Sequence, residues 1–343
     1  MVFFGLTILV LGFFTSLRAA EPQLPKAAES FATSEVKSNA LSYPTCSAPP
    51  EAHQEEEEKY LDQRLLLGLV RPLVDKYPAE KQRQDLTFKN FFTYGWDVGW
   101  KEPDEGPNDA PRFGLLRIQR AFWEREIRLV HSYTFGVDGG AADEQELEME
   151  VELPINRRFL IEFEPAVLSV RANSRSWDFG GGDLKVIPQV MLWETKDLSF
   201  SSILVVRTPT GTRRVGEGRT SLMPSLALWT DLGERSGLHT FFGAEFPLDG
   251  YEAGHRDAVL QYGIAPAKTV TSKDTMLLGN LTFFAEFNGT TDMGRQKQTT
   301  LTLLPGVRWL LFKDFWLATG YEFPLTGTKA LESRVWFSIY RDF

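Results

Sequence analysis

The clearest chemical pattern in this sequence is a row of glutamates that alternate with apolar residues. In the segment 146–154 they occupy every second position: Glu146, Glu148, Glu150 and Glu152. Because successive side chains of a strand point to opposite faces, this spacing places all four carboxylates on one face. Carboxylates along the wall of a narrow passage attract cations and repel anions. The pattern therefore indicates selection of charged solutes.

Residue types that could catalyse a reaction are present, but their spacing does not suit catalysis. His131 and Ser132 are adjacent, so on a strand they point to opposite faces and cannot form a base and nucleophile pair. Gly180 to Gly182 lacks the Lys-Ser/Thr that follows the glycines of a phosphate-binding loop. We expect no enzymatic activity, although a lipid hydrolase built on a membrane barrel stays open as an alternative.

Metal, cofactor and nucleic-acid chemistry have little support in the sequence. His53, His239 and His255 have no partners at the spacing of a zinc site, and Cys46 is the single cysteine. The formal charge of -9 argues against binding along a phosphate backbone, which needs clustered Lys and Arg. We therefore expect no metal, no cofactor and no nucleic-acid partner.

The first part of the chain has the composition of a secreted protein's leader. Val2 to Phe14 form an apolar run that is too short for a helix to span a bilayer, so we interpret residues 1–20 as a signal peptide, with an uncleaved anchor as the alternative. Residues 21–123 then form an extension with a flexible leader, a helical pattern at 54–75 and an aromatic-rich stretch at 88–123. This extension could pack conventionally or plug a barrel.

Beyond residue 123 the hydrophobic positions recur with a period of two, in segments of the length expected of tilted membrane strands. Twelve segments show this pattern: 124–137, 146–154, 158–171, 182–194, 198–209, 219–231, 238–248, 256–267, 275–288, 299–312, 315–326 and 331–343. The connections alternate between tight turns, such as Lys313-Asp314, and longer polar or glycine-rich loops. Short turns at one rim and longer loops at the other are typical of bacterial outer-membrane barrels.

The two faces of these segments predict which side chains line the interior. A Lys or Arg that faces lipid at mid-membrane costs about 2–4 kcal/mol, so the outer face should carry almost no charge. His131 and Arg341 are the exceptions, and Arg341 should lie near the rim, where the cost falls to about 0–1 kcal/mol. The predicted lumen-lining residues are Glu146, Glu148, Glu150, Glu152, Glu162, Glu164, Lys185, Arg207, Glu245, Glu286, Arg308, Glu322, Glu332 and Arg334. A soluble β-sandwich would also alternate and stays open as a second architecture.

The last segment, 331–343, should close the barrel by pairing with the first, which removes both sheet edges. We expect Glu332 and Arg334 to lie beside Arg128 and Glu126 in the lumen. The ending resembles that of outer-membrane barrels whose terminal aromatic is read by the barrel-assembly machinery, and this resemblance implies the same role for Phe343.

Short motifs add a family resemblance. Gly180-Gly181-Gly182-Asp183-Leu184 begins one predicted strand, Arg207-Thr208-Pro209-Thr210-Gly211 ends its hairpin, and Pro224 lies in the next strand. Together with Phe343, these motifs resemble the outer-membrane porins and transporters grouped with the meta-pathway of phenol degradation. The resemblance covers residues 124–343 and leaves out 88–123. It implies a twelve-stranded barrel that passes small, often aromatic, organic compounds.

The sequence thus predicts an all-β, antiparallel transmembrane β-barrel at 124–343 in the cell outer membrane, with lipid, the assembly machinery and a small solute as partners. Its function would be a narrow, cation-preferring pore, with Trp193, Trp229 and Trp336 available to apolar solutes. Two alternatives remain: a barrel that Glu and Arg pairs hold shut, and a barrel that only anchors surface loops. The oligomeric state is left open.

Overall fold

The structure is a computed structural model, and it describes residues 84–102, 110–173, 177–248, 258–294, 298–326 and 331–342. The predicted signal peptide, the helical pattern at 54–75 and Phe343 lie outside these residues. Within them, no helix is both long and apolar enough to cross a membrane, a result that does not bear on crossing by strands.

The described chain is dominated by antiparallel strands, with one short helix, α3 (Val137–Gly140). The strands are β1 (Glu126–Gly136), β2 (Ala142–Pro154), β3 (Phe159–Asn173), β4 (Trp177–Gly180), β5 (Leu184–Glu194), β6 (Leu198–Thr208), β7 (Ser221–Gly233), β8 (Ser236–Pro247), β9 (Val259–Thr269), β10 (Gly279–Asp292), β11 (Thr299–Phe312), β12 (Phe315–Pro324) and β13 (Ser333–Asp342).

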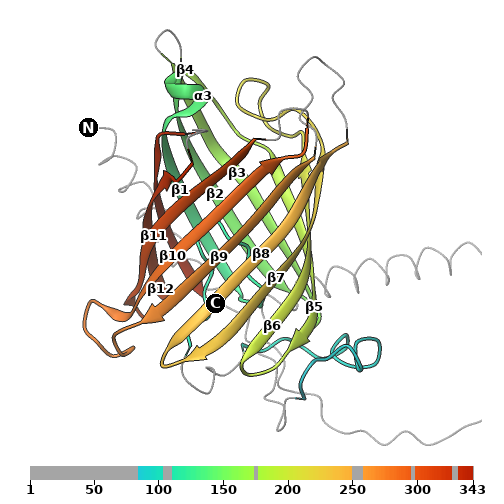
Figure 1. Cartoon of the computed structure of the whole chain (residues 1–343). Helices are drawn as coiled ribbons and strands as arrows, with labels where there is room; N and C mark the ends of the chain where they lie inside the picture. Colours follow the sequence, from blue (N-terminus) through green and yellow to red (C-terminus); the bar gives the residue numbers. More distant parts are fainter. Residues whose placement is uncertain are drawn as a thin grey trace, which may run out of the picture. The chain divides into compact units, whose positions relative to one another are not determined.

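Twelve of these strands close into a barrel (Figure 1). Each pairs with its neighbour in sequence, and the ring is completed where β1 pairs with β13. The short β4 pairs only with the end of β3, so it extends one hairpin and is not part of the ring. A closed antiparallel ring satisfies every backbone group without leaving an edge, which membrane lipid requires. The predicted twelve-stranded barrel is confirmed.

The connections also follow the predicted rule. Turns of two to four residues join β2 to β3, β5 to β6, β7 to β8 and β11 to β12. The turn between β9 and β10 is longer than predicted: β10 begins at Gly279 and not near residue 275, which leaves residues 270–278 between the strands. We call the rim that carries these turns the short-turn rim; in bacterial outer-membrane barrels such turns lie on the periplasmic side.

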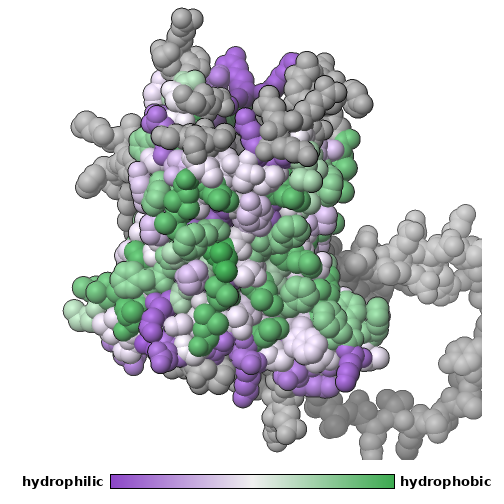
Figure 2. Space-filling model, in the orientation of Figure 1, coloured by the Kyte–Doolittle hydropathy of each residue, from purple (hydrophilic) through white to green (hydrophobic). Residues whose placement is uncertain are grey.

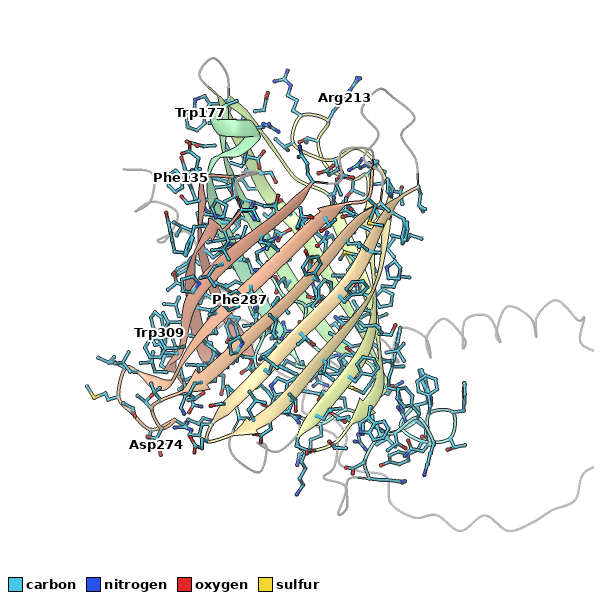
Figure 3. All side chains as sticks on the ribbon, in the orientation of Figure 1. Phe135, Trp177, Arg213, Asp274, Phe287 and Trp309 are labelled. Atoms are coloured by element: carbon cyan, nitrogen blue, oxygen red, sulfur yellow. The ribbon has the colours of Figure 1, made fainter. Side chains whose placement is uncertain are left out.

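The outer face of the barrel is apolar. Figure 2 shows hydrophobic side chains over the strands and hydrophilic ones gathered towards the two ends. Exposed outward residues include Phe242, Phe283 and Phe287, and in Figure 3 Trp309 projects from the outside of the sheet. Arg213 and Asp274, in contrast, lie in loops at opposite rims (Figure 3). An apolar band between polar ends is the surface that a bilayer matches.

Two segments before β1 pack against this barrel in different places. Residues 84–102 lie beside the short-turn ends of β5 and β6 (Figure 1), where Leu86 pairs with Glu194 in an isolated bridge. Residues 110–125, which we call the lumenal loop, run inside the barrel, and most of their side chains are buried there. The lumenal loop therefore contributes to the core that the inward faces of the strands enclose.

Candidate functional site

The apex of the lumenal loop is bound by a single carboxylate of the barrel wall. Glu286, which is fully buried on β10, accepts the backbone N–H groups of Leu116 at 2.8 Å, Arg117 at 3.1 Å and Ile118 at 3.0 Å. Consecutive N–H groups that converge on one anion form a strong, charge-assisted contact. Glu286 points inward as predicted, but it holds the loop and does not line an open passage.

A second wall carboxylate binds the side chain of the same apex. Glu322 on β12 pairs with the guanidinium of Arg117 and accepts hydrogen bonds from Thr302 at 2.7 Å and from the Trp336 indole at 3.0 Å. Arg334 lies on the same carboxylate at 3.9 Å. Glu322 is completely buried by these partners.

Deeper in the lumen, Arg120 gathers carboxylates from the loop and from two strands. Its guanidinium pairs with Glu124, with Glu126 on β1 at 2.6 Å and with Glu152 on β2. Burial alone would lower the pKa of Arg120, but the attraction of Glu126, Glu152 and Glu124 outweighs it and raises this pKa well above its ordinary value. Arg120 therefore carries its charge firmly in this cluster.

Arg128 of β1 continues the charged layer. It contacts Glu126 at 2.9 Å and Glu150 at 3.3 Å, and it donates to the carbonyl oxygen of Leu115 at 2.8 Å. Its guanidinium also lies 4.5 Å from the centre of the Tyr340 ring. The arginine thus connects the strand that begins the barrel with the strand that ends it and with the loop.

Aromatic side chains form an apolar layer beside these charges. Phe113 and Phe122 of the lumenal loop each contact the ring of His239 on β8, with centroids 5.5 and 6.0 Å apart. The Trp229 indole of β7 donates to the carbonyl oxygen of Pro111 at 3.0 Å, and Arg112 stacks over its ring. All these rings are buried, so the loop fills this level of the barrel.

The charged side chains between the lumenal loop and the rim opposite the short turns are also paired with each other. Lys185 of β5 bridges Glu148 at 2.7 Å and Glu164 at 3.0 Å, and Gln119 of the loop donates to Glu164 at 3.3 Å. Glu162 accepts a hydrogen bond from Gln189 at 2.9 Å. These predicted lining residues do face inward, but polar partners already satisfy them.

Beyond this level the lumen opens into a cavity of about 440 Å³, which we call the outer cavity. Its lining carries acids and bases in similar number, among them Glu146, Glu148, Asp183, Lys185, Arg207 and Arg334. Arg207 lies 3.5 Å from Glu245 and 3.9 Å from Glu217, while Ser169 donates to Glu146 at 3.3 Å.

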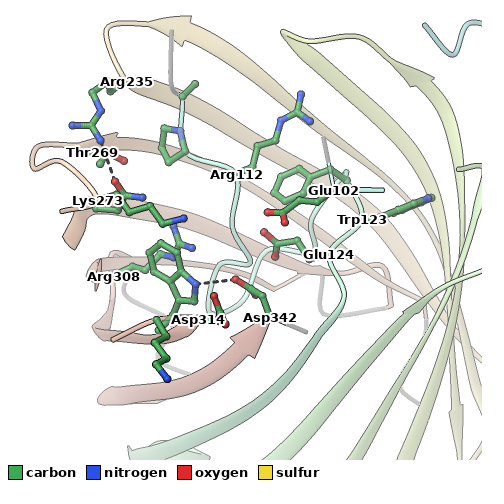
Figure 4. Close-up of a pocket in the computed structure, with 16 residues that line it drawn as sticks. Glu102, Arg112, Trp123, Glu124, Arg235, Thr269, Lys273, Arg308, Asp314 and Asp342 are labelled. Carbon is green, nitrogen blue, oxygen red and sulfur yellow. Dashed lines mark hydrogen bonds between the residues drawn. The ribbon is translucent and has the colours of Figure 1, made fainter. Parts of the chain in front are cut away.

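A second cavity, of about 190 Å³, lies at the short-turn end of the lumen (Figure 4). Its lining includes Arg112, Trp123 and Glu124 of the loop. Arg308 lies 3.4 Å from the centre of the Trp316 ring, and that indole donates to Asp342 at 2.8 Å. We call it the inner cavity. The lumenal loop and its partners lie between the two cavities.

Two predictions about the last strand need correction. Glu332 is exposed and precedes β13, with its side chain beside Gly136 at the rim. The predicted neighbours are also wrong: Glu126 pairs with Asp342 and Arg128 with Tyr340, whereas Arg334 pairs with Thr134. Antiparallel pairing places the start of one strand opposite the end of the other, so residues 332–334 meet the end of β1.

The three tryptophans proposed for solute contact behave differently. An irregularity in β5 between Met191 and Trp193 shifts the alternation, so Trp193 pairs with outward-facing Phe200 and points outside. Trp229 and Trp336 do point inward, but both are buried and hydrogen-bonded. None of the three is positioned to contact a solute in this structure.

The geometry gives no support to hydrolase chemistry at His131 and Ser132. Ser132 is buried on the inner face of β1, and His131 lies on the outer face, as expected of adjacent strand residues. Among the residues that the structure describes, no group of three or more His, Cys, Asp or Glu side chains could hold a metal ion.

The sequence left open that residues 21–123 plug the barrel, but it did not single out the lumenal loop as the part that enters the lumen. A signal was present: the predicted lining holds far more acids than bases, and two arginines that pair with these acids, Arg117 and Arg120, lie just before β1. An acidic lumen next to an arginine-rich, apolar segment could have pointed to their pairing.

A family model described as "Putative MetA-pathway of phenol degradation" matches residues 106–338. The match includes the lumenal loop, which the resemblance in the sequence left out. A search of curated proteins gave no significant match.

Solved barrels share the architecture at low sequence identity. The COG4313 outer membrane channel from Pseudomonas putida F1 is 13% identical over 64% of this chain and 94% of its own, with a TM-score of 0.49. The NanC porin is 12% identical over 63% of this chain and 98% of its own, with a TM-score of 0.44. The KdgM porin is 10% identical over 64% of this chain and 99% of its own, with a TM-score of 0.41.

Proposed function

We propose that the barrel is an outer-membrane channel for small organic solutes, aromatic ones among them. The premise is that the chain belongs to the family described as "Putative MetA-pathway of phenol degradation". The observation that carries the proposal is a lumen with a cavity at each end and a bound loop between them. A barrel that served only as an anchor has no need of two cavities in one lumen.

The lumenal loop closes the passage in this state. Its apex binds Glu286 on β10 and Glu322 on β12, and Arg120 reaches Glu126 and Glu152 on β1 and β2, further round the ring. Twelve strands leave a narrow interior, so a loop held at both sides is enough to fill it. Solute passage then requires this loop to move.

Displacement of the loop changes the charge of the lumen. Arg117 and Arg120 leave with the loop, whereas Glu286, Glu322 and Glu152 stay on the wall without their partners. Carboxylates exposed in this way favour cations. The open channel is therefore cation-preferring, although the closed lumen is largely neutralised by ion pairs.

A reversible lock tests this proposal. A Cβ atom at Gly263 would lie 2.8 Å from Cγ1 of Ile118, so cysteines at these two positions are close enough to form a disulfide. With Cys46→Ser as background, Ile118→Cys/Gly263→Cys should conduct in planar bilayers when reduced and fall silent when oxidised. Each single cysteine variant is the matched control, and its conductance should be the same under reducing and oxidising conditions.

A closed structural barrel is the second candidate, and the buried ion pairs that Arg120 of the loop makes with Glu126 and Glu152 favour it. The same measurement separates the two. If neither the wild-type protein nor the reduced double-cysteine variant conducts, the channel proposal is wrong. Conductance that the oxidised lock leaves unchanged would show a passage that does not depend on the loop.

A further inference from the structure

Residues 86–98 form an aromatic turn that projects from the short-turn rim. Phe88, Phe92 and Trp96 expose 56%, 89% and 39% of their surface. Phe91 lies between two of them, with ring centroids 5.0 Å from Phe92 and 5.5 Å from Trp96. Large apolar rings gathered on one exposed turn indicate a contact surface, because water-facing turns rarely carry them.

The barrel holds this turn firmly through a buried arginine. Arg158, which has no exposed surface, donates to the Asn90 side chain at 2.7 Å and to the carbonyl oxygen of Tyr94 at 3.0 Å. Its guanidinium also lies 5.1 Å from the centre of the Phe91 ring. The exposed rings are therefore presented in one fixed arrangement.

A second buried arginine and a pair of backbone bonds complete the attachment. Arg157 donates through its backbone N–H to Val98 at 3.0 Å and through its side chain to Gln84 at 2.9 Å. Leu86 and Glu194 exchange backbone hydrogen bonds of 2.9 and 2.8 Å. Both ends of the turn are thus bonded to the barrel.

The aromatic turn is continuous with the lipid-facing surface. The Phe88 ring contacts Trp193 at 5.6 Å and Phe200 at 6.3 Å between centroids. Phe200 faces outward because its neighbours Ser199 and Ser201 are buried inside, and Trp193 is its partner across the strands. The turn therefore extends the outer apolar band beyond the barrel wall.

We propose that residues 86–98 form a membrane anchor that inserts its aromatic rings into the periplasmic leaflet of the outer membrane. Trp and Phe gain free energy at the boundary between headgroups and acyl chains, and the indole N–H of Trp96 is already satisfied by the Phe91 carbonyl at 2.6 Å. Exposed Lys89 on the same turn suits a phospholipid phosphate. The anchor fixes the segment just before the lumenal loop to the bilayer.

Depth-dependent quenching in the full chain tests this anchor. A bimane label is attached to Phe92→Cys in a Cys46→Ser background. The labelled protein is reconstituted in vesicles of phosphatidylethanolamine and phosphatidylglycerol. The bimane fluorescence is then compared with and without lipids that carry a nitroxide quencher near the headgroup. Lys196→Cys, in an exposed turn of the same rim, is the aqueous control, and Phe242→Cys, on the outer wall, is the lipid control. Heat-modifiable migration confirms that each variant is folded.

If the anchor is inserted, the nitroxide lipid should quench the bimane fluorescence at position 92 at least half as strongly as it quenches the label at position 242. The emission maximum at position 92 should also lie at a shorter wavelength than the maximum at position 196. A label at 92 that resembles the one at 196 overturns the proposal. A second result would also overturn the anchor proposal: energy transfer between copies labelled with donor and acceptor at position 92, seen at high dilution in lipid and without nitroxide quenching. The turn would then contact a second copy of the chain.

Discussion

Glu286, on β10 of the barrel wall, accepts the backbone N–H of Leu116 in the lumenal loop at 2.8 Å. The two residues are far apart in the chain, and both are buried. Arg117 and Ile118 donate to the same carboxylate, so one wall residue fixes the turn at the apex of the loop. The position of the loop therefore depends on a contact that a single substitution can remove.

Glu286→Ala should loosen the apex and increase conductance. The substitution leaves three backbone N–H groups without their acceptor, and each buried unsatisfied group costs about 1–3 kcal/mol. We expect more frequent openings in planar bilayers than for the wild-type protein.

Glu234→Gln is the control for this change, because Glu234 lies in an exposed turn with 91% of its side chain accessible. It removes one carboxylate charge without touching the loop. An unchanged conductance of Glu286→Ala, or an equal increase in both variants, contradicts the anchoring role.

Arg120→Met should destabilise the barrel more than the loss of one surface ion pair. It leaves Glu126 and Glu152 buried with like charges and without their common partner, and removal of one member of a buried pair costs about 3–5 kcal/mol. In heat-modifiable migration, the temperature at which the folded band is replaced by the unfolded band should fall. Adding Glu152→Gln should restore part of the loss, since one uncompensated charge disappears, and no recovery would argue against the pairing.

His239→Phe should stabilise the barrel. His239 is 1% exposed among the rings of Phe113 and Phe122, and neither of its nitrogens has a hydrogen-bond partner among the described residues. Replacing an unsatisfied buried polar group by an apolar ring of similar size removes a cost of about 1–3 kcal/mol. Heat-modifiable migration should shift to a higher temperature, and a shift to a lower one would show that an unseen partner satisfies the imidazole.

The barrel could be predicted from the sequence because a membrane imposes a simple rule on each strand. Alternation of Glu with Leu, Met and Val in β2 fixes one face to the lumen and the other to lipid. The alternation of short and long connections then fixes the number of strands and their closure. Both signals are local, so a single sequence is sufficient.

Other features depend on contacts that local patterns do not encode. The irregularity before Trp193 adds one residue to β5 and reverses the face of that ring, and neither glycine nor proline lies between Met191 and Trp193 to mark it. Pairing between β13 and β1 sets the neighbours of Arg334, and alternation alone cannot supply that register. The acids of the lumen were found, but their partners came from the lumenal loop, which lacks the period of a strand.

Glu322→Gln should reduce the preference of the open channel for cations. Glu322 stays on the barrel wall when Arg117 leaves with the loop, so its charge is one of those that face the open passage. A carboxylate in the lumen attracts cations, so its neutralisation should move the reversal potential across a KCl gradient away from the potassium equilibrium potential. Glu234→Gln, in an exposed turn, removes the same charge outside the lumen and should leave the reversal potential unchanged. A shift towards the potassium equilibrium potential for Glu322→Gln, or equal shifts for both variants, would show that Glu322 does not set the selectivity.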